Sequence, residues 1–252
     1  MAERPTLEAV IFDAGGTLVR LDFEWMAHAV AEAGVATDAA ILRRAEVEGR
    51  RAYDHSRRRP NSPSAPLGGP GDIRRYFGGM LEAADVPAAR IEAVIDRFIE
   101  RERDAGLWTR PMEGARAAVE GVGALGLRRA VISNSDGRAE WHLEHTGLRA
   151  GLEFVIDSQR VGVEKPDPAI FRLALERLDV PAARALYVGD IRSVDEDGAA
   201  AAGMQFVLID PSGSYGADGG PAVRGVEALP VWVAERFQVP RPSVTPSTAR
   251  GD

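Results

Sequence analysis

The expected fold follows from one stretch of the sequence, Val10-Ile11-Phe12-Asp13-Ala14-Gly15-Gly16-Thr17-Leu18. The apolar run Ala9–Phe12 is short and continuous, and a carboxylate and two glycines soon follow it. This pattern predicts a fully buried strand followed by a tight turn. Backbone N–H groups of such a turn can face a phosphate, with Asp13 beside them. The alternative is an ordinary strand-to-loop turn in which Asp13 is a local cap.

Four later apolar runs share this character, since each is short and ends at polar or glycine residues: Ala130–Ile132, Phe154–Ile156, Ala185–Val188 and Phe206–Ile209. The segments around them have the pattern of amphipathic helices: Met112–Leu125, Arg138–His145, Pro168–Leu178 and Val194–Ala202. Strands that alternate with helices predict an α/β fold with a Rossmann-like, doubly wound parallel sheet. In such sheets ligands bind at the carboxyl ends of the strands.

The first two predicted strands are separated by a long interval rich in Ala, Arg and Glu, with apolar residues at helical spacing. Its predicted helices are Phe23–Val35, Ala39–Ala52, Ile73–Ala84 and Ile91–Ile99. An insertion of this size predicts a helical cap over residues 21–105, with residues 1–20 and 106–237 forming the core. The Pro-, Ser- and Gly-rich stretch 57–70 predicts a mobile loop, and the composition of residues 238–252 predicts a disordered tail.

Three groups of polar residues follow the later strands: a serine with an asparagine, a lysine, and a pair of aspartates. Ser133 and Asn134 end the second strand, where a hydroxyl before a helix suits an anion, although capping of that helix by Ser135 or Asp136 is the better explanation for this motif taken alone. Lys165 is the sole lysine among 31 basic residues, and its compact charge could hold a phosphoryl group. Asp190 and Asp195 follow the fourth strand, and clustered carboxylates suit a hard cation such as Mg2+. Acidic placement in the first turn of a helix is the competing interpretation.

The composition excludes several classes of function. The 252 residues carry a formal net charge of −7, which argues against nucleic acid as a partner, because phosphate backbones are held by basic surfaces. The chain has no cysteine, so it has neither disulfides nor thiolate chemistry. No apolar run approaches the ~20 residues that span a bilayer. No leader pattern is visible either, so we expect a cytoplasmic protein without a membrane partner.

Taken together, and in this order after successive strands, the four motifs resemble those of the haloacid dehalogenase superfamily. Its members have a strand-terminal Asp-x-Asp-Gly-Thr, then Ser or Thr, then Lys, then Gly-Asp with a second Asp a few residues on. The position of the cap resembles the helical-cap subfamily, which includes β-phosphoglucomutase-like and phosphoglycolate-phosphatase-like enzymes. The resemblance covers the chain to about residue 237.

The resemblance implies a Mg2+-dependent hydrolase, expected to be a phosphatase, that acts on a small phosphorylated compound. It implies that Asp13 is the nucleophile and also a metal ligand, that Asp190 and Asp195 bind Mg2+, and that Lys165 neutralises the phosphoryl group. The remaining implied roles fall to three residues: Ser133 and the Asn134 N–H as phosphate ligands, and Gly15, whose carbonyl would bind Mg2+ beside the phosphate site. Substrate identity and oligomeric state do not follow from the resemblance.

The sequence departs from the family pattern at one position, where Gly15 replaces the second aspartate of the first motif. That aspartate normally protonates the leaving group, and general acid–base help is worth ~10²–10⁴-fold in rate. We therefore expect weak turnover of alkyl phosphates, and a smaller loss for acyl or aryl phosphates. A substitute acid could come from Asp22, Glu24 or His28, although an ordinary helix start explains these three better.

The missing aspartate keeps two alternatives open. One is a phosphate-binding or regulatory protein that has lost efficient catalysis. The other is a 2-haloacid dehalogenase, although those enzymes need no metal and lack the Gly-Asp that is present here as Gly189 and Asp190. Phosphonoacetaldehyde hydrolases also have a small residue at this position, but they use a cap lysine, and this cap contains no lysine.

Overall fold

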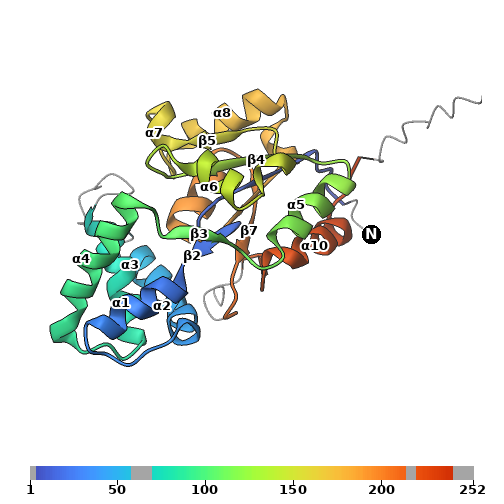
Figure 1. Cartoon of the computed structure of the whole chain (residues 1–252). Helices are drawn as coiled ribbons and strands as arrows, with labels where there is room; N and C mark the ends of the chain where they lie inside the picture. Colours follow the sequence, from blue (N-terminus) through green and yellow to red (C-terminus); the bar gives the residue numbers. More distant parts are fainter. Residues whose placement is uncertain (1–3, 58–69, 214–219, 241–252) are drawn as a thin grey trace, which may run out of the picture.

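The computed structural model of the chain describes residues 4–57, 70–213 and 220–240. A parallel sheet covered by helices forms the core, and four helices form a cap that lies to one side of it (Figure 1). The cap is inserted between the first strand of the core and the next strand of the same sheet.

The core sheet has six strands in the order β5-β4-β1-β6-β7-β8, all paired in parallel. Their bounds are β1 Ala9–Phe12, β4 Arg128–Ser133, β5 Val155–Asp157, β6 Ala185–Gly189, β7 Gln205–Ile209 and β8 Ala222–Val223. The chain builds the sheet outward from β1 to β4 and β5, and then returns to β6 on the other side of β1. The carboxyl ends of β1 and β6 therefore flank the point where the strand order reverses, which is where ligands bind in such sheets.

Alternate side chains of β1 enter two separate cores, because successive residues of a strand point to opposite faces. Val10 and Phe12 pack on one face with the helices α5 and α10, whereas Ala9 and Ile11 pack on the other with α8 and α9. All four residues are fully buried, which explains why this strand is apolar without a break. The helices of the core are α5 Ala115–Ala124, α6 Ala139–His145, α7 Ser158–Val161, α8 Pro168–Leu178, α9 Asp197–Ala201 and α10 Leu229–Arg236.

The described part of the core also contains short helical turns: η1 Arg149–Gly151, η2 Ala182–Arg184, η3 Arg192–Glu196 and η4 Val226–Ala228. The widened turn η3 leads directly from the end of β6 into α9. This connection determines where Asp195 lies, as described below.

The cap has its own hydrophobic core, to which all four of its helices contribute: α1 Phe23–Glu32, α2 Ala39–Arg57, α3 Pro70–Ala83 and α4 Ala88–Asp104. The two crossings between core and cap run side by side, because β2 (Val19–Leu21) pairs antiparallel with β3 (Trp108–Pro111) (Figure 1). Cap and core are thus joined by one two-stranded ribbon.

The α/β sheet predicted from the sequence is confirmed, and the five predicted strands correspond to β1, β4, β5, β6 and β7. The ribbon β2–β3 and the edge strand β8 were not predicted, because they are short and partly exposed. The predicted loop 57–70 lies almost wholly outside the described residues. Of the predicted tail, 241–252 lie outside them too, whereas Gln238 pairs with the N-terminal segment through its carbonyl, which accepts from the Leu7 N–H at 2.8 Å. Within the described ranges, no helix combines the length and apolar character needed to cross a membrane.

Candidate active site

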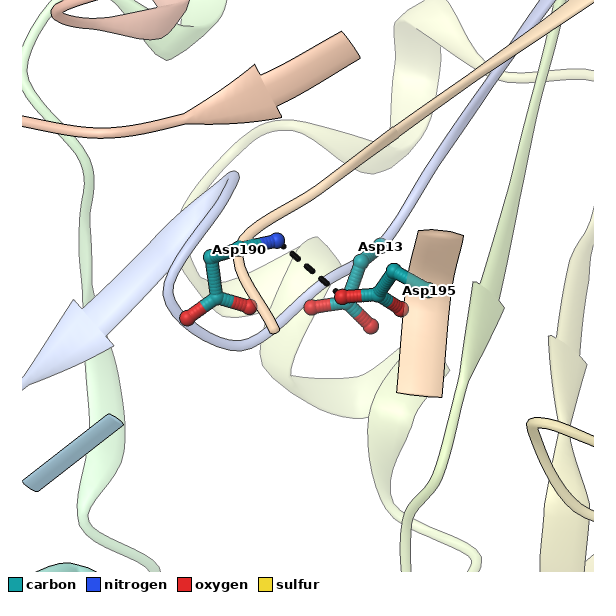
Figure 2. Close-up of side chains that lie close together, drawn as sticks. All are labelled: Asp13, Asp190 and Asp195. Carbon is teal, nitrogen blue, oxygen red and sulfur yellow. Dashed lines mark hydrogen bonds between the residues drawn. The ribbon is translucent and has the colours of Figure 1, made fainter. Parts of the chain in front are cut away.

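Three carboxylates converge at the carboxyl ends of the two central strands. Asp13 follows β1, Asp190 follows β6, and Asp195 lies in the turn η3 behind it. One oxygen of each lies within 4.8 Å of the others, and all three residues are buried. Figure 2 shows them pointing into one small space, with the backbone N–H of Asp190 donating to the carboxylate of Asp195. Three hard oxygen ligands in one place suit Mg2+.

Lys165 joins two of these carboxylates. Its Nζ donates to Oδ1 of Asp13 at 2.5 Å and to Oδ1 of Asp195 at 2.7 Å, and its third bond goes to the hydroxyl of Tyr187 at 2.9 Å. The side chain is 3% exposed. Burial by itself lowers the pKa of Lys165, but Asp13 and Asp195 outweigh that effect and raise the pKa well above its usual value. The ammonium is therefore charged at neutral pH.

The carboxyl group of Asp13 has a raised pKa of about 6, because burial disfavours its ionised form more than the nearby Lys165 favours it. Asp13 is therefore mostly ionised at neutral pH. Burial also raises the pKa of Asp190 well above its usual value, and Arg50 only partly offsets this. In both carboxyl groups the effect of burial on the pKa exceeds the opposing effect of the nearest cation.

Side chains on neighbouring loops hold this cluster in place. The amide of Asn134 donates to the Lys165 carbonyl at 2.9 Å and accepts from its N–H at 2.8 Å, so it clamps the loop that carries Lys165. Oδ2 of Asp195 accepts from the backbone N–H groups of Asp190 and Ile191, each at 3.0 Å. Gly16 has a φ of +79°, and a Cβ there would lie 2.1 Å from an oxygen of Asp190. Only glycine allows this turn to pack so closely against the carboxylate.

The cap contributes a second charged group to the same cluster. Arg50 of α2 is 2% exposed and forms ion pairs with Asp190 at 3.3 Å and with Glu46 at 3.2 Å. The hydroxyl of Tyr76 donates to Glu46 at 2.7 Å. Among the described groups that these ion pairs join, carboxylates outnumber cations by two, since Asp13, Asp190, Asp195 and Glu46 face Lys165 and Arg50. A divalent cation would close this difference, so the residues fit Mg2+.

The site residues that the family resemblance implies all line one cavity of about 770 Å³ between core and cap: Asp13, Gly15, Ser133, Asn134, Lys165, Asp190 and Asp195. Residues up to 182 positions apart in the chain are thus brought together by the parallel sheet. The cavity has a floor of polar loops on the core, and its opposite wall comes from the cap helices and the ribbon.

None of the three suggested substitutes for the missing acid lies in the lining of this cavity. Asp22 caps α1 by accepting from the Trp25 N–H at 3.2 Å, and it pairs with Arg110 at 3.0 Å. Glu24 pairs with Arg20, and His28 pairs with Glu32 on the surface of the cap. The ordinary helix start explains all three.

Sequence reasoning missed three contributors to the site: Arg50, Tyr187 and Trp108. Arg50 had a detectable signal, because the buried stripe of α2 includes Glu46 and Arg50 four residues apart among apolar and small residues. Tyr187 lies inside an apolar run, where its hydroxyl carried no signal. Trp108 begins the strand that leads back from the cap, and its contact with Gly15 depends on tertiary structure alone.

Comparison with known proteins identifies the family. Residues 7–203 match the model of the haloacid dehalogenase-like hydrolases. The chain is 33% identical over 218 residues to the mouse (Mus musculus) haloacid dehalogenase-like hydrolase domain-containing protein 3, covering 83% of this chain and 84% of that protein. It is 28% identical over 172 residues to a phosphoglycolate phosphatase of Pseudomonas fluorescens, covering 68% of this chain and 61% of the relative.

Solved structures agree on the fold. A phosphatase from Thermococcus onnurineus has a TM-score of 0.55 at 21% identity, with 92% of this chain and 100% of that chain covered. A dehalogenase bearing an intermediate has a TM-score of 0.59 at 21% identity, with 91% and 98% covered. The fold is common to both chemistries, so the reaction must be argued from the site itself.

Proposed function

Because this chain belongs to the haloacid dehalogenase-like hydrolase family, we propose that it hydrolyses a small phosphorylated compound through a phosphoryl group carried on Asp13, with Mg2+ as its cofactor. The observation that carries the proposal is the buried cluster in which Lys165 bridges Asp13 and Asp195 beside Asp190. An excess of buried carboxylate at the end of the central strand suits a metal-assisted transfer of a phosphoryl group.

In the first step, the free carboxylate oxygen of Asp13 attacks phosphorus, and the bond from phosphorus to the leaving oxygen breaks. The leaving group departs with the electrons of that bond. Water then attacks the phosphorus of the aspartyl phosphate, and the bond from phosphorus to the Asp13 oxygen breaks. This restores the carboxylate and releases inorganic phosphate, and the proton of the water passes to the phosphate or to solvent. Lys165 neutralises charge on Asp13 and on the incoming phosphoryl group. Ser133 and the N–H of Asn134 would hold the phosphoryl oxygens.

The metal would be held directly by Asp13, Asp190 and the carbonyl of Gly15. Both oxygens of Asp195 already accept hydrogen bonds, Oδ1 from Lys165 and Oδ2 from two backbone N–H groups, so this residue suits contact through a water molecule. When bound, Mg2+ would supply positive charge that offsets the repulsion between the nucleophile and the phosphate.

The test is hydrolysis of p-nitrophenyl phosphate and acetyl phosphate, with Mg2+ and after its removal with EDTA. Asp13→Asn should abolish release of phosphate, with a loss of at least about 10³-fold, because the amide is not a nucleophile. The matched control is Asp197→Asn, since Asp197 is an exposed aspartate close behind Asp195. It should keep full activity.

Two other outcomes point to the alternatives. A folded protein that binds Mg2+ and phosphate but turns over neither compound would be a phosphate-binding protein. Release of chloride from 2-chloropropionate without Mg2+ would indicate a dehalogenase. Either result, with no Mg2+-dependent release of phosphate, would overturn the proposal.

A further inference from the structure

Trp108 occupies the space in front of Gly15. A Cβ atom on Gly15 would lie 3.1 Å from Cδ1 and 3.2 Å from Nε1 of the indole ring. Contacts this short mean that the ring must shift by a few tenths of an ångström if position 15 carries a side chain. The indole therefore crowds any side chain at position 15, and its N–H can donate a hydrogen bond but is no general acid.

The ring of Trp108 is fixed from the cap side. Its centroid lies 6.2 Å from the ring of Tyr76 and 6.2 Å from that of Phe77, and both of these rings are buried. Aromatic rings at such separations stabilise one another. Trp108 itself is partly exposed and lines the cavity, so part of its surface is available to a ligand.

The wall of the cavity opposite the carboxylates is apolar. Its side chains come from the cap and from β3: Tyr53, Ile73, Tyr76, Phe77, Ile99 and Trp108. In the described part of the cap, the charged residues in the lining are Glu102 and Arg103, which lie at the C-terminal end of α4. The polar atoms of the six side chains in this wall are the two tyrosine hydroxyls and the indole N–H of Trp108. A sugar or other polyhydroxylated body would therefore leave most of its hydroxyl groups without partners against this wall, which costs free energy.

We propose that the site selects phosphorylated compounds whose body next to the phosphoryl group is aromatic or otherwise apolar, and that Trp108 determines this specificity by stacking on that body. The inference rests on the proposed function for the phosphoryl end of the site. The site lacks an acid at position 15 and has an aromatic side chain beside the phosphoryl site. Aryl and aromatic acyl phosphates suit both features, because their leaving groups depart without a proton and their rings can stack on the indole.

The test uses phosphonates, which bind without reacting. Affinities of phenylphosphonate, methylphosphonate and 2-hydroxyethylphosphonate are measured by calorimetry in the presence of Mg2+. Phenylphosphonate should bind at least about 10-fold more tightly than the other two, since stacking of a ring on an aromatic side chain is worth a factor of this order. Trp108→Ala should remove most of this preference and leave methylphosphonate within about threefold of the wild-type affinity.

Two further variants keep the test decisive. Trp108→Phe retains a ring and should retain most of the preference, even if Trp108→Ala fails to fold. Trp141→Ala is the matched control, because Trp141 of α6 is 45% exposed and lies outside the cavity lining. Equal affinities of the wild-type protein for the three phosphonates would overturn the inference while leaving the proposed function intact. Binding of none of them would instead contradict the proposed function itself.

Discussion

The cavity has a core wall, formed by the loops after the strands of the sheet, and a cap wall, formed by the cap helices and β3. The side chains of the core wall are mainly charged or polar, whereas those of the cap wall are mainly apolar. The core wall presents Asp13, Lys165, Asp190 and Asp195 on loops at the ends of parallel strands. The cap wall presents rings and aliphatic chains, with Trp108 over Gly15. Groups that react must be fixed in charge and position, which a rigid sheet provides. Selection of a substrate depends on the shape of the surface that contacts it, and substitutions in an inserted cap can change that shape without disturbing the sheet.

Arg50 is the exception to this division, because it is a charge that the cap delivers to the core wall. Its ion pair with Asp190 crosses the interface in a fully buried position. The two walls are therefore coupled electrostatically through this buried pair.

The largest effect is expected on the core wall. Lys165→Met keeps the length of the side chain but leaves Asp13 and Asp195 without their shared cation. Activity should fall by about 10²–10³-fold, the usual loss when one preorganised electrostatic partner is removed. Lys165→Arg should not restore it, because the planar guanidinium fork does not fit the space of a compact ammonium. Initial rates with acetyl phosphate measure both.

The control for this variant is Arg160→Met, which removes an exposed cation from α7 and should change the rate little. Retention of more than a tenth of the wild-type rate by Lys165→Met would contradict a role for the ammonium in the reaction.

The next effect concerns the coupling of the walls. Arg50→Met removes the partner of two buried carboxylates, Glu46 and Asp190, and should lower the free energy of unfolding by about 3–5 kcal/mol. Arg43→Ala is the matched comparison, because Arg43 also lies on α2 and pairs with the core, with Glu113 at 2.9 Å, but on the surface. Its loss should cost under about 1 kcal/mol. Urea unfolding measures both, and equal losses would refute a special role for the buried pair.

A double variant adds a carboxyl group to the core wall at position 15 and removes the facing indole ring of Trp108 from the cap wall. Gly15→Asp alone should not raise hydrolysis of an alkyl phosphate such as ethyl phosphate, and should destabilise the protein by about 1–3 kcal/mol through overpacking against Trp108. Gly15→Asp with Trp108→Ala frees the space and should raise the rate by about 10²-fold through general acid catalysis. Trp108→Ala alone is the control. A full gain from the single Gly15→Asp variant would show that the indole does not block an acid.

The smallest effect is expected at Glu102, at the rim where the walls meet. Burial is the main cause that raises the pKa of Glu102 to about 7, against a hydrogen bond from the Leu107 N–H at 2.5 Å. Below about pH 4.5 both the folded and the unfolded chain carry this proton. Between about pH 4.5 and 7 the unfolded chain loses it first, so stability falls as pH rises through this window.

Glu102→Gln keeps an acceptor for the Leu107 N–H and removes the titration. The wild type should lose stability on going from pH 5 to pH 7.5, and the variant should not. The free energy of unfolding of the variant minus that of the wild type should therefore rise by on the order of 1 kcal/mol between these pH values. The rise is small because the 30% exposure of the side chain screens part of the shift. Urea unfolding at the two pH values gives the difference. A constant difference between variant and wild type would contradict the assignment.

Sequence reasoning found the core wall and missed most of the cap wall, for a physical reason. Asp13, Ser133 and Asp190 each end a buried strand, and parallel topology alone brings the ends of such strands together. Trp108 and Arg50 reach the site only because the cap folds back over the core, and no local pattern encodes that approach. The position of Lys165 was predictable from its motif, whereas its bond to Tyr187 depends on how the strands pack.

The single lysine of the chain has a further use, as a chemical probe of motion. Its ε-amine is 3% exposed and strongly protonated, so an amine-directed acylating reagent should not reach it in the closed molecule. Labelling at Lys165 then requires separation of cap and core or local unfolding. Because Lys165 is the only lysine of the chain, acylation of the peptide that contains it can be told apart by peptide mapping from acylation of the α-amine. The rate of that acylation would report the free energy of the opening, in the manner of hydrogen exchange at one buried amide.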